Sequence, residues 1–486
     1  MKEMFKHIIL AITISLTGCA LGPDFQEPVV ETPEHFQFDT LKDDSGVDLK
    51  WWELFDDPVL HSLVTIALNE NKDARIAASR IEEARASYGF TRADMYPRLD
   101  IDAGAGRGNF TGTIKTDSTN DYYYVAPVLS WEIDFWGKFR RSNEAAMADL
   151  LASEYALRVV QMSLISEVVG TYFLLLDYNQ RLEISERTLA SRLDSLEIIQ
   201  HRFDKGIIPE IDLNQAQIQK EIAAAAIPVH ERLIAKTKNT LSILLGRVPG
   251  EIETGIDLSS QTVPPDIPAG LPSSLLERRP DIVQAEYLLE AQTARIGVAE
   301  ALRWPAISLT GILGVASDDL STLTSNGTAW SVGGGLFGPL FDFGKSASQV
   351  DVEEERTKQA LLRYEKTVLV AFREVEDALI EIQTYKTQIA AVERRLKAAK
   401  NAAFLSKERY DKGFSSYLEV LETERTLFNV ELELSELEQQ FLNAYVKLYK
   451  ALGGGWTSRE EMEKAQEQNG EQKNDPPAKE IMQGES

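Results

Sequence analysis

The sequence predicts a mainly α-helical fold that carries a membrane β-barrel and is built from two tandem copies of one unit. Three observations predict it. Short motifs recur in the same order, 207 or 208 positions apart. Two pairs of segments of about ten residues alternate between apolar and more polar side chains, as outer-membrane barrel strands do. Two stretches of about 60 residues lack proline and nearly all glycine, which favours unusually long, coiled-coil-like helices.

The first 20 residues have the layout of a secretory signal rather than of a structural helix. Lys2 and Lys6 precede the apolar run IILAITISL, which is too short to span a bilayer, and LTGC follows. LTGC resembles a bacterial lipobox. That resemblance implies a signal peptide at 1–18, cleavage before Cys19, and acylation of Cys19 by chains such as palmitate. The residue after Cys19 is Ala20 rather than Asp, as in lipoproteins sorted to the outer membrane. The alternative to a lipidated Cys19 is a small, buried, unmodified cysteine.

Composition argues against several kinds of function. The net charge of −25 argues against a nucleic-acid partner, which would call for a basic face. Cys19 is the only cysteine, so a disulfide within the chain and a Cys-based metal cluster are both impossible. The five histidines are scattered without ligand spacing, and no phosphate-binding or nucleophile motif is present. We therefore expect no enzyme, no metal site, and no cofactor apart from the covalent lipid on Cys19.

Four short motifs define the two copies. They are RFDKG and RYDKG at 202 and 409, WGK and FGK at 136 and 343, LG at 245 and 452, and YP and WP at 96 and 304. We assign repeat 1 to 58–246 and repeat 2 to 280–456. Each repeat is expected to contain, in order, a helix, two strands joined by a loop, a long helix, a turn and a return helix.

The strands are expected as hairpins at 98–135 and 306–343. From Val125 to Phe135 the odd positions are apolar and the even ones more polar, and 307–315 alternate similarly. Polar loops are expected at 109–121 and 318–328, and the last strand at 329–343. Soluble sandwich strands look similar. If these strands lie in lipid, four of them cannot close a barrel and open edges are not tolerated, so several chains must share one barrel. No apolar run after residue 20 is long enough to predict a transmembrane helix.

The helices and the segments outside the repeats follow from proline, glycine and polarity. The predicted long helices cover 141–205 and 346–411, the return helices cover 208–245 and 416–452, and the helices before the strands cover 58–95 and 280–303. Pro228 should kink the first return helix. The segment 247–279 is rich in proline and predicts a linker, and the polar, acidic tail 457–486 predicts disorder.

Several stretches resemble one family, the TolC/NodT type of outer-membrane channel lipoprotein. They are LTGCALGPDF, WWELFDDPVLHSLVTIALNENKDARIAASRIEEARA, SWEIDFWGK, LLERRPDIVQAEYLLEAQTARIGVAEALRWPAISLTG, FDFGK, RYDKGFSSYLEVLETERTLF and LYKALGGGW. Together they span nearly all of 16–456. The departures are small: Trp304 stands where many relatives have Phe, and the acidic tail is additional.

The resemblance implies a fold and a function. It implies a homotrimer in which three chains, four strands each, share a 12-stranded barrel continued by a periplasmic α-helical coiled-coil barrel. It places 19–57 as an N-terminal anchored segment that joins 247–279 in an equatorial belt. It implies a passive duct in the outer membrane that works with a periplasmic adaptor and an inner-membrane pump in efflux, including multidrug efflux.

The resemblance also implies a gate at the periplasmic helical tip. An apolar ring would fall on Leu418 and an acidic ring on Glu422; ordinary helix packing and an exposed carboxylate are the alternatives. Charged residues would flank the two tip turns at Gly206 and Gly413, and some of them would form the ion pairs that hold the tip shut. These residues are Arg202, Asp204, Arg409 and Asp411.

The rival function is a non-conducting coiled-coil stalk or adhesin anchored at the cell surface. Matched β-hairpins with an apolar face argue against a stalk, which has no use for them. The pump partner selects the cargo in a passive duct, so drugs, metals, fatty acids and siderophores are all compatible with the sequence.

Overall fold

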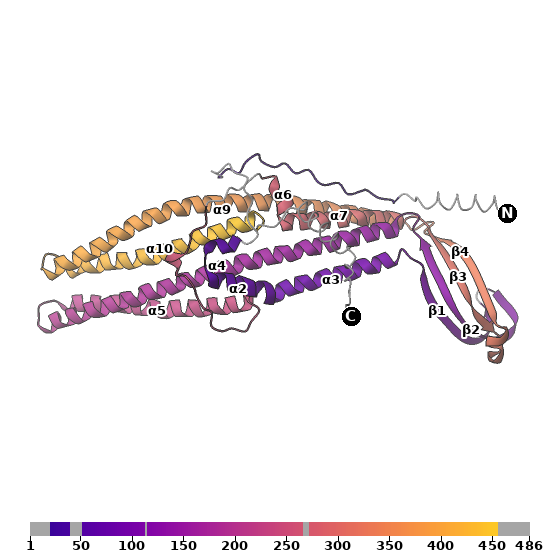
Figure 1. Cartoon of the computed structure of the whole chain (residues 1–486), viewed down its shortest axis with the longest axis horizontal. Coiled ribbons are helices and arrows are strands. Elements are labelled where there is room, and N and C mark those ends of the chain that lie inside the picture. Colours follow the sequence, from indigo (N-terminus) through magenta and orange to yellow (C-terminus); the bar gives the residue numbers. More distant parts are fainter. Residues whose placement is uncertain (1–19, 39–50, 112–113, 266–271, 455–486) are drawn as a thin grey trace, which may run out of the picture. The chain divides into compact units, whose positions relative to one another are not determined.

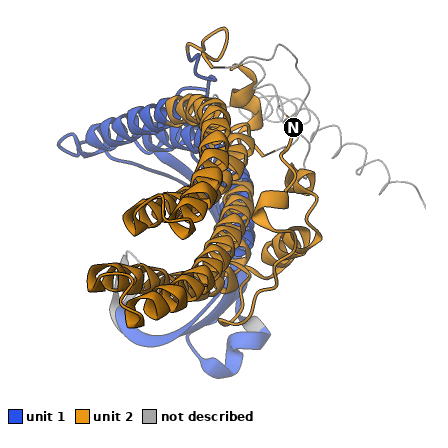
Figure 2. Ribbon diagram, turned by 90° about the vertical axis from the view of Figure 1, so that its left-hand side faces the viewer, with its two compact units in different colours: residues 1–30, 78–155, 284–366 blue, residues 31–77, 156–283, 367–486 orange. Residues whose placement is uncertain are grey.

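The computed structural model describes residues 20–38, 51–111, 114–265 and 272–454. The predicted signal peptide at 1–18, Cys19 and the predicted tail at 457–486 lie outside the described residues. The chain divides into two compact units (Figure 2). Unit 1 comprises Met1–Val30, Ala78–Tyr155 and Gln284–Lys366, and unit 2 comprises Glu31–Ala77, Ala156–Val283 and Thr367–Ser486.

The described residues form long helices and one sheet (Figure 1). The α-helices are α2 (Pro58–Glu70), α3 (Lys72–Ala93), α4 (Lys138–Asp204), α5 (Glu210–Leu244), α6 (Ser274–Arg278), α7 (Pro280–Ala301), α8 (Leu323–Asn326), α9 (Lys345–Asp411) and α10 (Tyr417–Ala451). The strands are β1 (Arg98–Thr111), β2 (Ile114–Ile133), β3 (Ala306–Ser317) and β4 (Thr328–Phe337). Short 3₁₀ helices are η1 (Trp51–Phe55), η2 (Leu258–Ser260) and η3 (Leu320–Thr322).

Corresponding elements of the two repeats have the same length. Helices α4 and α9 both have 67 residues, α5 and α10 both have 35, and α3 and α7 both have 22. Each long helix is followed by a short turn and a return helix, as the repeated motifs predict. Pro228 lies inside α5, which continues on both sides of it. The two copies therefore keep one architecture.

The four strands form one antiparallel sheet in unit 1, in the order β1-β2-β3-β4. The central pair joins the two repeats, because β2 of repeat 1 pairs with β3 of repeat 2. Leu129 of β2 lies opposite Leu99 of β1 on one side and Gly311 of β3 on the other. Strands β1 and β4 are the two edges of the sheet within the described residues.

The two faces of the sheet differ in chemistry. Residues that lie opposite one another across a strand pair share a face, so the register assigns every side chain. One face carries large apolar side chains that are exposed in the single chain: Leu99, Ile101, Val125, Leu129, Leu309, Leu313, Trp330, Val332 and Leu336. The opposite face is mostly small or polar, with Asp100, Asp102, Gly104, Gly106, Ser130, Ser308, Thr310 and Gly333. Trp330 is 74% exposed, so the described residues leave the apolar face uncovered.

The strand and loop boundaries differ from the predictions in three places. The predicted loop at 109–121 is mostly strand, since β1 runs to Thr111 and β2 begins at Ile114; its threonines suit a pleated backbone. The predicted loop at 318–328 contains η3 and α8, and the Asp319 carboxylate accepts a hydrogen bond from the Ser321 amide. The strand predicted at 329–343 ends at Phe337, because Gly338 and Pro339 follow and proline cannot donate to a ladder.

The helix predicted at 58–95 is interrupted at Asn71. Its side-chain oxygen accepts a hydrogen bond from the Ala74 amide, which caps α3, and its side-chain amide donates to the Leu244 carbonyl oxygen at 2.9 Å. The corresponding contact just before repeat 2 comes from Arg279, whose guanidinium donates to the Ala451 carbonyl oxygen. Different residues thus link the starts of α3 and α7 to the ends of α5 and α10.

The main core of unit 2 combines aliphatic side chains with several buried aromatic rings. Trp51 is buried and stacks on Tyr449, with ring centroids 4.9 Å apart. Asp57 is also buried and caps α2 through the amides of Val59 and Leu60. Its other oxygen accepts hydrogen bonds from the Tyr172 hydroxyl, the Gln261 side chain and the Ile256 amide. This carboxylate therefore ties the linker after α5 to α2 and α4.

One helix in the described residues, α4, contains an 18-residue stretch with a mean hydropathy of 1.7, apolar enough to cross a membrane by length and composition. Half of that stretch is buried inside the chain. Val168, Val169 and Tyr172 belong to the core of unit 2. The stretch is therefore interpreted as a core helix.

Candidate functional site

The first part of the candidate site is the pair of tip turns in unit 2. Gly206 has a φ of 70° and Gly413 a φ of 77°, a conformation that residues with a Cβ atom rarely adopt. The Ile207 amide donates to the Arg202 carbonyl at 2.9 Å, and the Phe414 amide to the Arg409 carbonyl at 2.8 Å. These hydrogen bonds close both long helices with the same C-terminal cap. The repeated glycines are thus explained by helix termination.

One ion pair joins the ends of the two long helices. A guanidinium nitrogen of Arg202 lies 3.0 Å from Asp411 Oδ1, and the guanidinium carbon lies 4.9 Å from the Tyr410 ring centroid. The pair links the tip of repeat 1 to the tip of repeat 2. It is the kind of contact predicted to hold the tip shut.

The other two predicted tip residues make contacts within their own repeats. Arg409 Nε lies 3.3 Å from Glu419 Oε1 across the repeat 2 turn. Asp204 accepts a hydrogen bond from the Gln200 side chain at 2.8 Å. The sequence shows that charged residues flank both turns, but only side-chain geometry distinguishes the bridging pair from the local ones.

The two predicted gate residues lie on an exposed face of α10. Leu418 is 61% exposed, whereas its neighbours Tyr417, Val420 and Leu421 are buried in a small apolar cluster at the tip. Leu418 is therefore not an ordinary packing residue within this chain. Glu422, one turn further along the same face, is also exposed.

The carboxylate of Glu422 has a basic partner that sequence reasoning missed. Arg425 Nη2 lies 2.6 Å from Glu422 Oε2, and both side chains are more than half exposed. Three-residue spacing in a helix brings such side chains together, so the signal was present in the sequence. An acidic ring at Glu422 would therefore be accompanied by a ring of arginines.

Arg192 is a second residue that sequence reasoning missed. It is 4% exposed; a guanidinium nitrogen donates to the Gln219 carbonyl, and the guanidinium lies 5.3 Å from the Phe428 ring centroid. Burial lowers the pKa of Arg192, and burial raises the pKa of neighbouring Glu424 although Arg192 opposes that rise. Arg192 lies seven residues before buried Ile199 on α4, a spacing that predicts the inward face. It connects α4 with α5 and α10.

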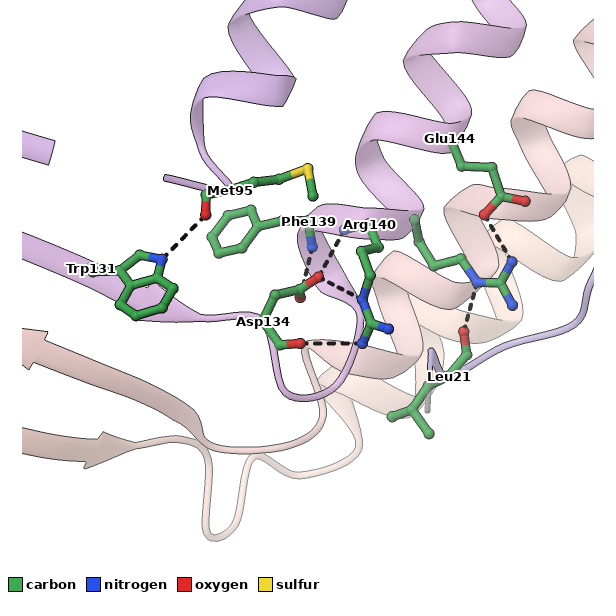
Figure 3. Close-up of polar contacts among 8 residues, drawn as sticks. Leu21, Met95, Trp131, Asp134, Phe139, Arg140 and Glu144 are labelled. Carbon is green, nitrogen blue, oxygen red and sulfur yellow. Dashed lines mark hydrogen bonds and ion pairs between the residues drawn. The ribbon is translucent and has the colours of Figure 1, made fainter. Parts of the chain in front are cut away.

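The second part of the candidate site is the β2–α4 junction in unit 1 (Figure 3). The Asp134 carboxylate accepts hydrogen bonds from the Phe139 and Arg140 amides and from Arg140 Nε. The Trp131 ring donates to the Met95 carbonyl oxygen at 3.2 Å. The Asp134 contacts tie the end of β2 to the first turn of α4, and the Trp131 contact ties β2 to the segment between α3 and β1.

The segment that begins at Ala20 packs against this junction. The Leu21 amide donates to the Trp136 carbonyl at 3.1 Å, and the nearly buried Arg141 guanidinium donates to the Leu21 and Gly22 carbonyls. Figure 3 shows the hydrogen bonds that the Arg141 guanidinium donates to the Leu21 carbonyl and to the Glu144 carboxylate. Gly22 has a φ of 87°, and a Cβ there would lie 2.4 Å from the Gly297 Cα. The residues that follow Cys19 are therefore held at the end of β2.

The described residues contain no group of three or more His, Cys, Asp or Glu side chains arranged to hold a metal ion. The candidate site consists of a charged helical tip in unit 2 and, in unit 1, an exposed apolar sheet face with an N-terminal segment bound at the end of β2.

Comparison with known proteins identifies similar outer-membrane efflux proteins. The family model described as "Outer membrane efflux protein" matches residues 63–247 and again 271–454, one match for each repeat. The solvent efflux pump outer membrane protein SrpC of Pseudomonas putida is 36% identical, over 93% of this chain and 99% of its own length. The cation efflux system protein CusC of Escherichia coli is 35% identical over the same shares of the two chains.

A solved structure is also similar. The outer membrane channel MtrE of Neisseria gonorrhoeae, crystallised in its open state, matches with a TM-score of 0.81 and 30% identity, over 90% of this chain and 98% of its own. The TolC-like fold predicted from the sequence is thereby confirmed. Two matches of one family model, covering more than half of the chain, show that the chain belongs to the outer membrane efflux protein family.

Proposed function

We propose that three copies of this chain close one 12-stranded barrel in the outer membrane and form the exit duct of a tripartite efflux system. The observation that carries the proposal is the four-stranded sheet. Its edges β1 and β4 have no partner strand among the described residues, and its exposed face is apolar. Lipid tolerates a sheet only when every edge is paired, so edge pairing between copies satisfies both features.

The helical tip is proposed to be the gate. Leu418 and Glu422 would form an apolar and an acidic ring on α10, and the Arg202–Asp411 ion pair would hold the two repeats together in the closed state. A relative crystallised in an open state supports a channel with more than one conformation. The duct would be passive and have no catalytic residue or cofactor, and an inner-membrane pump would supply the energy.

The relatives support a proposal about the partners and the cargo. A periplasmic adaptor and an inner-membrane pump are proposed, because the related proteins belong to efflux pumps and efflux systems. One relative is named for solvents and another for cations, although their sequences are similarly close to this chain. Related ducts thus serve different cargoes, which supports a pump that selects the cargo and a duct that accepts it.

The lipid anchor on Cys19 is proposed as well. Its support is the signal-like N-terminus together with the Arg141 contacts, which hold Leu21 and Gly22 at the end of a strand that would lie in the membrane. Acyl chains on Cys19 would then enter the outer membrane beside the barrel wall. Mass spectrometry of the mature N-terminus tests the modification directly.

Two measurements on the purified protein test the duct. Unboiled gel samples should migrate as a trimer, and the trimer should conduct ions in a planar bilayer. A stable trimer without conductance would support the stalk and overturn the duct. A conducting species that is not trimeric would overturn the stoichiometry alone.

A further inference from the structure

Two tyrosines on the polar face of the sheet lie flat against the neighbouring strand. Tyr124 and Tyr122 of β2 stand directly opposite Gly104 and Gly106 of β1. The two rings are nearly parallel, at 19°, with centroids 6.4 Å apart. The Tyr124 hydroxyl also points to the Asp102 carboxylate, 3.4 Å away on β1. Both rings therefore lean across β1.

The glycines make this position possible. A Cβ atom on Gly104 would lie 2.5 Å from Tyr124 Cε1, and a Cβ on Gly106 would lie 2.4 Å from Tyr122 Cζ. These distances are far inside van der Waals contact, so any larger residue would have to lift the ring off the strand. Gly333 of β4 shares this face, yet a Cβ there would meet nothing within 4 Å.

The face that carries the tyrosines is the one that would line the duct. It holds Asp100, Asp102, Ser308 and Thr310, whereas the opposite face is apolar and exposed. Outer-membrane barrels turn their apolar side chains to lipid and their polar ones to the lumen. This assignment rests on the barrel proposed above.

We propose that Gly104 and Gly106 set the width of the barrel lumen by letting Tyr122 and Tyr124 lie against the wall. An upright tyrosine would extend its ring and hydroxyl into the lumen, and in a trimer each such ring would appear three times at one level. The glycines thus determine the largest cargo that the barrel part of the duct accepts. The rings present a flat, amphipathic surface that suits bulky solutes with aromatic or apolar groups.

The test is polymer exclusion. Polyethylene glycols of graded size are added to the barrel side of single trimers in planar bilayers, and the largest polymer that enters and lowers the current is recorded. A double variant, Gly104→Val with Gly106→Val, should admit only smaller polymers than the wild type. Adding Tyr122→Ala and Tyr124→Ala should restore or exceed the wild-type limit. Gly333→Val should leave the limit unchanged, because its side chain displaces no ring.

The outcomes separate this inference from the proposed duct. An unchanged limit in the double valine variant, in trimers that form and conduct, would overturn the inference and leave the duct intact. A reduced limit that persists after removal of both tyrosines would also overturn it. If the valine variants do not form trimers, Gly104→Ala and Gly106→Ala test the same clash with a smaller side chain. A wild type that does not conduct would instead overturn the duct.

Discussion

The ion pair between Arg202 and Asp411 is the contact through which the tip is most directly perturbed. Replacing Arg202 with Ala removes a charged hydrogen bond of 3.0 Å to Asp411 and a cation–π contact with Tyr410. Both contacts join repeat 1 to repeat 2, whereas the turns themselves are closed by backbone hydrogen bonds. The substitution should therefore release the two hairpins from each other without unfolding either.

The free energy lost in Arg202→Ala can be worked out from how exposed the two paired side chains are. The two side chains are 29% and 47% exposed, so the pair contributes about 0.5 kcal/mol after solvent screening. The ring contact adds about 0.5 to 1 kcal/mol. The loss is about 1 kcal/mol in each chain and about 3 kcal/mol for three chains that open together, which is roughly a hundredfold in the closed-to-open equilibrium.

Single-channel recording measures this shift as open probability. Arg202→Ala should open the channel far more often than the wild type, and the charge exchange Arg202→Asp with Asp411→Arg should close it again in part. Arg409→Ala is the matched control, because Arg409 pairs with Glu419 inside repeat 2. Equal effects of Arg202→Ala and Arg409→Ala, or no change in open probability with Arg202→Ala, would refute the view that the Arg202–Asp411 ion pair keeps the tip closed.

Three further predictions concern the acidic ring, the core and the N-terminal segment. Glu422→Gln should lower the preference for cations in reversal-potential measurements, and Arg425→Gln should raise it; identical selectivity in both variants would count against the ring. Burial alone would raise the pKa of Asp57, but hydrogen bonds from Tyr172, Gln261 and two backbone amides lower it below its ordinary value. This carboxylate therefore stabilises the fold above about pH 4, and its contribution falls as the pH falls through its folded-state pKa. Asp57→Asn should lower the free energy of unfolding by about 2 to 3 kcal/mol at neutral pH and by less in acid. Thermal melts at pH 7 and pH 3 measure this difference, and a pH-independent cost would contradict it. Arg141→Ala should expose residues 20–30 to limited proteolysis. Arg140→Ala, which removes the contacts with Asp134 and leaves those of Arg141 with Leu21 and Gly22, should not. Equal cleavage of both variants would contradict the role of Arg141 in holding this segment.

The architecture could be predicted because its signals are local and occur twice. RFDKG and RYDKG place glycine where a helix must end with positive φ, and the absence of proline between such points allows a helix of 67 residues. The alternation along β2 and β3 likewise reflects a local rule, since successive side chains point to opposite faces.

The features that could not be predicted from the sequence depend on contacts between residues far apart in the chain. Asn71 interrupts a helix because its side chain caps the next helix and reaches the Leu244 carbonyl, 173 positions away. Arg192 is buried because α5 and α10 close over it; its spacing from Ile199 predicts an inward position but not the carbonyl and the ring that it contacts. Among the tip charges, the choice of Asp411 rather than Asp204 as the partner of Arg202 depends on tertiary geometry alone.

The apolar stretch in α4 has a consequence for biogenesis. A protein of the outer membrane crosses the inner membrane as an unfolded chain, and a segment of 18 residues with a mean hydropathy of 1.7 comes close in length and composition to a membrane-spanning helix. Glu167, Thr171 and neighbouring serines lower the hydropathy of this region of the helix. The residues that build the core of the folded protein are thus limited in how apolar they can become, because the same residues must first be exported.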